Sequence, residues 1–249
     1  MDLQKYRETE QEQARIADIF RLLPQVRRSV LEIGARDGYI SRLLAERFEE
    51  VTALDLEKPA FEYPRVTTVA GDATHLQFAD NTFDTVLCTE VLEHIPPLQQ
   101  ACRELMRVAR HEILIGVPYR QDTRLGRTTC RQCGKINPPF AHVNTFDEQR
   151  LAALFPGMII QAKSFVGMTN EITNALSMTL MDMAGNPWGT YDQDEPCIHC
   201  GAKLLAPNGR SLMSRVYSGV AIRFNRLQTA VTRPHPNWIH IVFSKDAGR

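Results

Sequence analysis

The stretch from Ser29 to Leu56 constrains the fold more than any other part of the sequence. It begins with a short apolar run that stops at Gly34, continues from Gly38 with apolar residues at helical spacing, and ends in a second run that leads into Asp55. This order predicts a strand, a glycine turn, a helix and a second strand, which together form a βαβ unit. A glycine turn lets the backbone approach a ligand closely, and an acid after the second strand can accept hydrogen bonds from ribose hydroxyls. The stretch therefore predicts a nucleotide-type site.

Two further strands make the pattern more specific. Residues 67–70 read as a third strand that leads into Asp72, and residues 83–88 read as a fourth, followed by the sequence Glu-Val-Leu-Glu-His-Ile. Because the first turn also reads Glu-x-Gly-x-x-x-Gly, the chain resembles the class I S-adenosylmethionine (SAM) dependent methyltransferases of the branch called methyltransferase domain 11. The resemblance covers about residues 28–118, and residues 236–243 look like the family's last strand.

The resemblance implies a fold and a set of cofactor contacts. The fold is α/β, a Rossmann-like, doubly wound and mostly parallel seven-stranded sheet with helices on both faces. Asp55 would bind the ribose hydroxyls of SAM, and Asp72 would bind its adenine amino group. The family usually has glycine where this chain has Arg36, so the sequence does not decide whether the backbone approaches the cofactor closely at that position. The other residues expected around the cofactor, of which the first four would hold its methionine part, are Glu32, Gly34, Ala35, Gly38, Leu56, Ala73 and Glu90.

A glycine turn alone would also suit a nicotinamide enzyme, a flavoprotein or simple packing.

No catalytic residue is assigned from the sequence. A general base is needed only if the methyl acceptor is a hydroxyl or a protonated amine. Glu93 and His94 are interpreted first as residues that cap or orient the helix that begins near Pro97. The candidates for a general base are Glu90, His94, Tyr119 and His142.

Two Cys-x-x-Cys-Gly sequences form the second strong pattern. They supply four thiolates, which complete the tetrahedral shell of one structural Zn²⁺, and the glycine after each pair permits a tight turn. The pairs are 64 positions apart, so the metal would join two insertions of one fold. Disulfides, a redox pair and iron are the alternatives; a cytosolic location disfavours the disulfides. His142 and His199 are possible ligands, but the shell is already closed by Cys130, Cys133, Cys197 and Cys200.

Length and spacing favour a single domain over residues 1–249. Thr145 and Glu148 predict a capping box at the start of a helix. A methionine-rich helix is predicted at 171–184, either as adaptable core or as the wall of a substrate pocket. The predicted parts of the domain are an N-terminal helix at 4–23, the SAM-binding core at 28–118, cysteine-bearing insertions at about 119–145 and 186–207, and a C-terminal helix and last strand at 209–245.

The N-terminus is polar, and no apolar run approaches the roughly 20 residues that span a bilayer. We therefore expect no transmembrane segment and a cytoplasmic location. The sequence does not indicate the oligomeric state.

The net charge of zero conceals an asymmetry that bears on the methyl acceptor. Residues 1–95 are rich in acids, whereas residues 196–245 contain no acid and seven Lys or Arg, and residues 120–135 hold five bases against one acid. A basic surface favours an anionic acceptor, such as a small molecule or a glycan or lipid precursor, although it can also be a solvated face. RNA or protein methylation, or SAM binding without transfer, are the alternatives. Nucleic acid is less favoured, because the bases lack interleaved aromatic residues.

Overall fold

The structure is a computed structural model that describes residues 3–25 and 27–245; residues 1–2, 26 and 246–249 lie outside the description. The chain divides into two compact units. The core unit consists of Glu10–Tyr119, Phe146–Gly167 and Trp238–Arg249, and the insertion unit of Met1–Thr9, Arg120–Thr145 and Met168–Asn237. The single domain expected over residues 1–249 stays a prediction, and its two ends fall outside the described residues.

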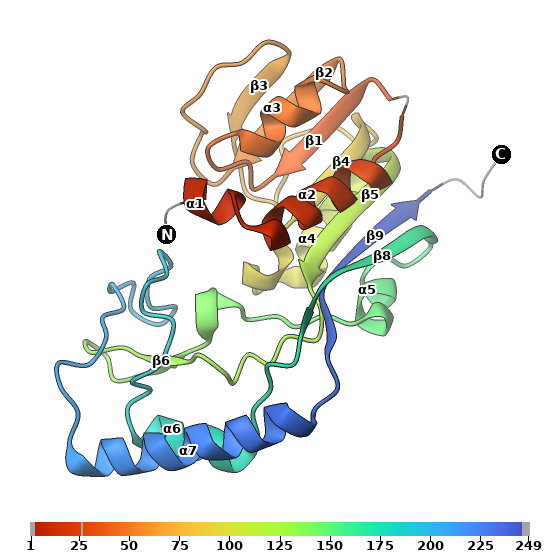
Figure 1. The fold of residues 1–249 in the computed structure, drawn as a ribbon. Helices are drawn as coiled ribbons and strands as arrows, with labels where there is room; N and C mark the ends of the chain where they lie inside the picture. Colours follow the sequence, from red (N-terminus) through yellow and green to blue (C-terminus); the bar gives the residue numbers. More distant parts are fainter. Residues whose placement is uncertain (1–2, 26, 246–249) are drawn as a thin grey trace. The chain divides into compact units, whose positions relative to one another are not determined.

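The main sheet has seven strands in the order β3-β2-β1-β4-β5-β9-β8 (Figure 1). Neighbouring strands from β3 to β5 are parallel, and β9 runs antiparallel to β5. This arrangement confirms the predicted Rossmann-like, mostly parallel sheet. Because the strand order reverses between β1 and β4, their carboxyl ends mark the place where such sheets bind ligands. The strands are β1 (Ser29–Ile33), β2 (Glu50–Asp55), β3 (Val66–Ala70), β4 (Phe83–Thr89), β5 (Ala109–Pro118), β8 (Ile159–Thr169) and β9 (His235–Ser244).

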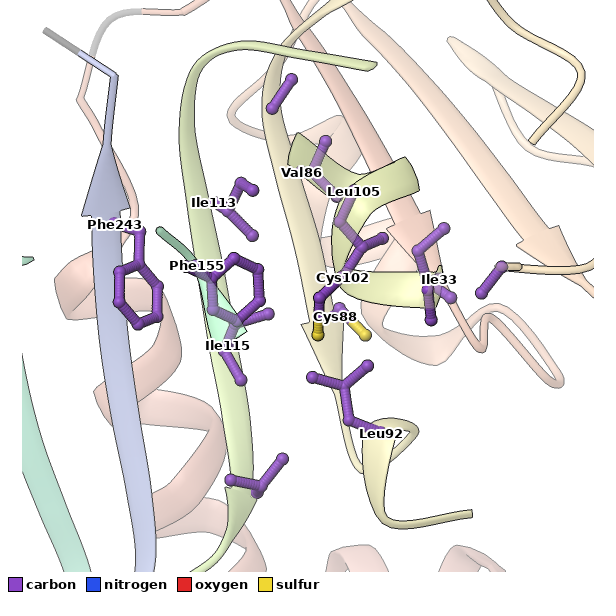
Figure 2. Close-up of a cluster of buried hydrophobic side chains, with 14 of the residues drawn as sticks. Ile33, Val86, Cys88, Leu92, Cys102, Leu105, Ile113, Ile115, Phe155 and Phe243 are labelled. Carbon is purple, nitrogen blue, oxygen red and sulfur yellow. The ribbon is translucent and has the colours of Figure 1, made fainter. Parts of the chain in front are cut away.

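Helices cover both faces of this sheet because the central strands bury side chains on both sides. On one face, side chains such as Leu31 and Ile113 pack with α4 (Leu98–Val108) and α5 (Glu148–Leu154). Figure 2 shows part of this cluster, in which Cys88 of β4 lies beside Cys102 of α4. On the other face, Val30 and Leu114 pack with α2 (Glu10–Leu22) and α3 (Tyr39–Ala45). Both cysteines are free and buried.

The predicted N-terminal helix at 4–23 is wrong in one respect, because it is interrupted. Helix α1 (Leu3–Arg7) ends before α2 begins at Glu10. Thr9 turns the chain back: its amide and its hydroxyl both donate to the carbonyl oxygen of Tyr6, at 3.1 and 2.7 Å. A threonine side chain that bonds the local backbone competes with helix continuation, which explains the break.

The predicted capping box at Thr145 is also wrong. Helix α5 starts at Glu148, and its N-cap is Asp147, whose carboxylate accepts a 2.8 Å hydrogen bond from the amide of Arg150. Aspartate is as good an N-cap as threonine, and here it lies in extended backbone at the helix start.

The insertion unit contains two long helical segments that lie side by side (Figure 1). Helix α6 spans Ala175–Met183, shorter than the predicted 171–184, because Asn174 caps it by accepting from the amide of Ser177. Helix α7 spans Leu212–Val231. The unit also holds the strand pair β6 (Thr128–Thr129) and β7 (Ile136–Asn137) and the short 3-10 helix η2 (Pro139–Ala141), whereas η1 (Leu92–His94) belongs to the core unit. Within residues 3–25 and 27–245, no helix is long and apolar enough to cross a membrane.

Candidate functional site

The turn after β1 has the tight geometry that its two glycines predict. Gly34 and Gly38 have φ of +82° and +76°, a region that favours glycine. A Cβ atom would lie 2.4 Å from the Val91 side chain at Gly34 and 2.2 Å from the Phe61 ring at Gly38. Neither position therefore accepts a side chain without a shift of its neighbour.

Arg36 also has a left-handed backbone in this turn. Its φ is +47°, its side chain is exposed, and its amide donates a 2.8 Å hydrogen bond to Oδ2 of Asp55. A left-handed backbone strains any residue with a Cβ, so the turn holds Arg36 in this conformation at a conformational cost.

Glu32 is the most perturbed acid of this turn. It lies on β1, is buried, and accepts a 2.5 Å hydrogen bond from the Ser41 hydroxyl at the start of α3. Burial, opposed by that hydrogen bond and reinforced by the charges of Asp55 and Asp37, raises the pKa of Glu32 to about 7. A cationic ligand would offset the cost of burying the carboxylate, so the site fits the positively charged methionine part of SAM.

Asp55 and Asp72, the acids predicted at the strand ends, both accept hydrogen bonds from nearby backbone amides. Asp55, which ends β2, accepts from the amide of Leu56 at 2.7 Å in addition to the Arg36 amide. The Leu56 side chain is 76% exposed, although it is apolar, and is available to pack against a base. Asp72 follows β3 and accepts from the amide of Thr74 at 2.8 Å. Ala35 and Ala73 are buried.

Glu90 and Glu93 form an acidic pair at the end of β4. Glu90 has a left-handed φ of +57°, and its amide donates to the carbonyl oxygen of Gly116. Glu93 is fully buried, and neither of its carboxyl oxygens has a hydrogen-bond partner in the described residues. Burial and the charge of Glu90 raise the pKa of Glu93 well above its usual value. Helix α4 has no side-chain cap, so the interpretation of Glu93 as a cap is wrong.

Sequence reasoning missed a group of buried polar residues on α2 and β9. Glu12 and Arg15 form a buried ion pair at 2.5 Å. His240 is fully buried, and its Nδ1 lies 2.7 Å from Oδ2 of Asp18. Burial lowers the pKa of His240 against the opposing effect of Asp18. A carboxylate only accepts hydrogen bonds, so Nδ1–H is the donor to Asp18. In the sequence, the charged residues of α2 resemble an ordinary solvent-exposed helix face. The only signal of their burial is that Glu12, Arg15 and Asp18 recur every three residues and so share one side of the helix.

The four candidate bases are divided between the two units. Tyr119 belongs to the core unit and donates its phenol to Glu148 at 2.7 Å, so its oxygen is already engaged as a donor. Glu90 and His94 also belong to the core unit, whereas His142 belongs to the insertion unit. There the His142 Nδ1 lies 2.6 Å from the amide oxygen of Gln121.

The two cysteine pairs meet within the insertion unit. The sulfur atoms of Cys130, Cys133, Cys197 and Cys200 all lie within 4.8 Å of one another, and no two are bonded. The Sγ atoms of Cys130 and Cys200 are 3.7 Å apart, as are those of Cys133 and Cys197. This is the arrangement that four ligands around one tetrahedral metal ion require.

The two Cys-x-x-Cys-Gly turns have the same backbone geometry, as expected if both hold one metal ion. Gly134 donates its amide to the carbonyl oxygen of Cys130, and Gly201 does the same to Cys197, both at 2.9 Å. Both glycines have φ of +72° and nothing within 4 Å of an added Cβ, so they are required for backbone conformation and not for space. Burial raises the pKa of the Cys197 thiol, but backbone amides of His199 and Cys200 overcome this and lower it to about 6. A thiolate at this position suits a metal ligand.

Comparison with known proteins agrees with this geometry. A family model described as a methyltransferase domain matches residues 31–114. A Mycobacterium tuberculosis protein named "Probable S-adenosylmethionine-dependent methyltransferase" is 30% identical over 142 residues, which are 54% of this chain and 49% of that relative. The demethylmenaquinone methyltransferase of Thermobifida fusca is 34% identical over 91 residues, 32% of this chain and 39% of the relative. The chain thus spans about half or less of the length of these curated relatives.

Solved structures share the fold at low sequence identity. A methyltransferase solved in complex with the Haloferax volcanii activator Trm112 has a TM-score of 0.55 at 12% identity and is covered over 93% of its length, against 98% of this chain. The N-methyltransferase NodS of Bradyrhizobium japonicum, in complex with S-adenosylhomocysteine, has a TM-score of 0.54 at 12% identity, with 96% of this chain and 90% of NodS covered. At these identities the likeness concerns the fold alone. The matched model and the turn after β1 both lie in the core unit, so over residues 31–114 the chain is similar to SAM-dependent methyltransferases.

Proposed function

We propose that this protein transfers a methyl group from SAM to a small acceptor that carries one anionic group and an apolar part. The use of SAM is supported mainly by the turn after β1. There the Arg36 amide donates a hydrogen bond to Asp55 at the end of β2, and Glu32 of β1 is buried. In this proposal Glu32, Gly34, Ala35 and Gly38 hold the methionine part of the cofactor. Asp55 holds the ribose hydroxyls, Asp72 the adenine amino group, and Leu56, Ala73 and Glu90 complete the site.

When bound, SAM supplies a methyl group already activated by its sulfonium. The protein then needs to align the acceptor and exclude water. Glu90 and Glu93 suit this task, because a buried acid pair favours a cationic neighbour, and it can hold a proton while that neighbour is absent. A general base is required only for a hydroxyl or protonated amine, and Glu90 is our first candidate since its Oε1 has no hydrogen-bond partner in the described residues.

A pocket within the insertion unit supports the second half of the proposal. Its volume is about 560 Å³, which suits a small amphiphile. Its apolar wall contains Met178 and Met181, so the methionine-rich helix does line a pocket, and the Ser177 hydroxyl on this wall is buried with no partner in the described residues. A ligand hydroxyl or carbonyl would satisfy that group.

Three guanidinium groups line the same pocket against the one exposed carboxylate of Glu171. Arg124 is paired with Asp122 at 2.8 Å, and Arg127 lies 3.2 Å from Asp182. Because these two charges are offset, Arg226 is the cation best able to bind an anionic ligand group. Guanidinium binds carboxylate and phosphate through two parallel hydrogen bonds, which favours these groups in the acceptor.

We further propose that Cys130, Cys133, Cys197 and Cys200 hold one structural Zn²⁺ in the insertion unit. Their mutual distances support this ligand set. Four sulfur ligands leave no open coordination position, so the metal would stabilise the fold and not act on substrate. The cytoplasmic location expected from the sequence stays a prediction.

The function is tested by measuring conversion of SAM to S-adenosylhomocysteine in the presence of a panel of carboxylated and phosphorylated amphiphiles. Acceptor-dependent turnover supports methyl transfer; SAM binding without turnover of any acceptor supports the alternative of a SAM-binding protein. The pocket is tested separately with dodecyl phosphate, read out by the fluorescence of Trp188, which lines it, in a Trp238→Phe background. Dodecyl phosphate should bind more tightly than dodecanol, and Arg226→Ala should abolish that difference.

A further inference from the structure

Helix α7 presents its apolar side chains to solvent. Leu212, Leu227 and Val231 are 77%, 68% and 82% exposed. At about 100° per residue these three positions lie on one side of the helix. The same side carries the exposed side chains of Met213, Val216 and Phe224. We call this set the α7 apolar face.

The opposite side of α7, which is small and polar, is the side that the insertion unit buries. Ser218 and Ala221 are 1% and 0% exposed. The Ser214 hydroxyl donates to the carbonyl oxygen of Ala184 at 2.7 Å, and Asn225 accepts from the Thr173 hydroxyl at 2.8 Å. A surface helix of a globular protein normally buries its apolar stripe and exposes its polar one. Helix α7 does the reverse, so its apolar face has been left for something other than the core.

All the charged residues of α7 are arginines. Arg215 and Arg226 lie along one margin of it, and Arg223 lies within it. Residues 196–245 contain no acid that could neutralise them. Just before the helix, the guanidinium of Arg210 stacks over the ring of Trp188 at 4.8 Å, and this indole is itself 58% exposed. Arginine and tryptophan beside exposed aliphatic residues are the composition of a helix that lies in a membrane interface.

Helix α6 packs beside α7 in the insertion unit (Figure 1). It also exposes apolar side chains, since Leu176 and Met183 are 54% and 59% exposed. We infer that the α7 apolar face docks the protein on a bilayer surface that contains anionic lipid. The helix lies on the bilayer and does not cross it, because no described helix is apolar enough to span.

The charges favour a bilayer over a second copy of this chain as the occupant. Two copies of α7 packed through their apolar faces would bring the arginines of each helix near those of the other, and the helix offers no acid to pair with them. Anionic lipid headgroups supply that negative charge, while the acyl boundary covers the apolar face. This inference does not depend on methyl transfer.

Co-sedimentation of the full chain with vesicles tests the inference. Phosphatidylcholine vesicles containing one quarter phosphatidylglycerol should bind the protein, and vesicles of pure phosphatidylcholine should bind it at least tenfold more weakly. The double change Leu227→Glu and Val231→Glu should abolish binding. The control Ile159→Glu, made at an apolar side chain of β8 that is 47% exposed, should leave binding unchanged.

Circular dichroism should show equal helix content in the wild type and both variants, so that any loss of binding is due to the surface. Arg215→Gln with Arg223→Gln should lower binding to the anionic vesicles and leave the weak binding to neutral ones unchanged. Absence of wild-type binding to anionic vesicles would overturn the inference. So would a wild-type dimer that the Leu227→Glu, Val231→Glu change dissociates while vesicle binding is absent, because the apolar face would then be an interface between copies.

Discussion

Replacing Glu32 with glutamine should reveal the cost of burying its carboxylate. The folded protein raises the pKa of this group from 4.5 to about 7. One pKa unit corresponds to about 1.4 kcal/mol, so the ionised group destabilises the cofactor-free fold by about 3 kcal/mol. The folded state binds the proton more tightly than the unfolded chain, so the stability due to this group is present below pH 4.5 and is lost as the pH rises through 7.

Glutamine keeps the size and the hydrogen bond of the protonated acid but does not ionise. Urea denaturation of the cofactor-free proteins should therefore show Glu32→Gln nearly equal to the wild type near pH 4.5 and more stable by about 3 kcal/mol at pH 8. The control Glu46→Gln changes an exposed carboxylate at the end of α3 and should not reproduce the gain of about 3 kcal/mol at pH 8. If the difference in the free energy of unfolding between Glu32→Gln and the wild type is the same at both pH values, burial does not raise the pKa of Glu32.

The same variant should weaken SAM binding, although it stabilises the fold. In the wild type the affinity for SAM should rise from pH 5 to pH 8, because the cationic cofactor favours the carboxylate and releases its proton. In Glu32→Gln the affinity should be at least about tenfold lower at pH 8 and should vary less with pH. Calorimetric titration in two buffers of different ionisation enthalpy measures both the affinity and the proton release. Equal affinities at pH 8 would exclude Glu32 from the cofactor site.

Three further predictions concern the backbone of Arg36, the metal ion and Asp18, the partner of the buried His240. Arg36→Gly should stabilise the protein by about 1 kcal/mol in urea denaturation, because it relieves a left-handed arginine; a loss of stability would contradict this. Elemental analysis should find one zinc per chain, and Cys133→Ser should lower both zinc content and melting temperature; stoichiometric iron would refute the assignment. Burial raises the pKa of Asp18, but hydrogen bonds from His240, Arg21 and Ser164 lower it to about 2. The stability from this depressed pKa, present above pH 3.8, should be lost as the pH falls towards 2, and Asp18→Asn should lack that component.

The sequence predicts the core unit well, because its signals are local. Apolar runs around a glycine turn predicted β1 and β2, and two further apolar runs predicted β3 and β4, all within a few residues. The acids at the ends of β2 and β3 were predictable for the same reason, since parallel strands bring their carboxyl ends to one edge of the sheet. The four cysteines were predictable from spacing alone, because the repeated knuckle requires a glycine with positive φ in both copies.

The remaining features depend on contacts that no local pattern encodes. A threonine that bonds Tyr6 breaks the N-terminal helix, and an aspartate competes successfully with Thr145 for the cap of α5. The buried pair of Asp18 and His240 joins residues 222 positions apart. The outward apolar face of α7 is hidden for a different reason: its periodicity is the same whether that face is buried or exposed. The burial of Ser218 and Ala221 on the opposite side of α7 is what shows that the apolar face points outward.

The central claim, that the strand ends of the core unit bind SAM, is tested most directly by calorimetric titration of SAM into the wild type and Asp55→Ala at pH 8. The wild type should bind one SAM per chain saturably, and Asp55→Ala should lose about 1 to 3 kcal/mol of binding free energy, since the ribose hydroxyls and the Arg36 amide would lose their shared acceptor. Asp80→Ala, which removes an exposed acid elsewhere in the core unit, should bind as the wild type does. No binding by the wild type would contradict the claim, and unchanged affinity in Asp55→Ala would contradict the assignment of the ribose site.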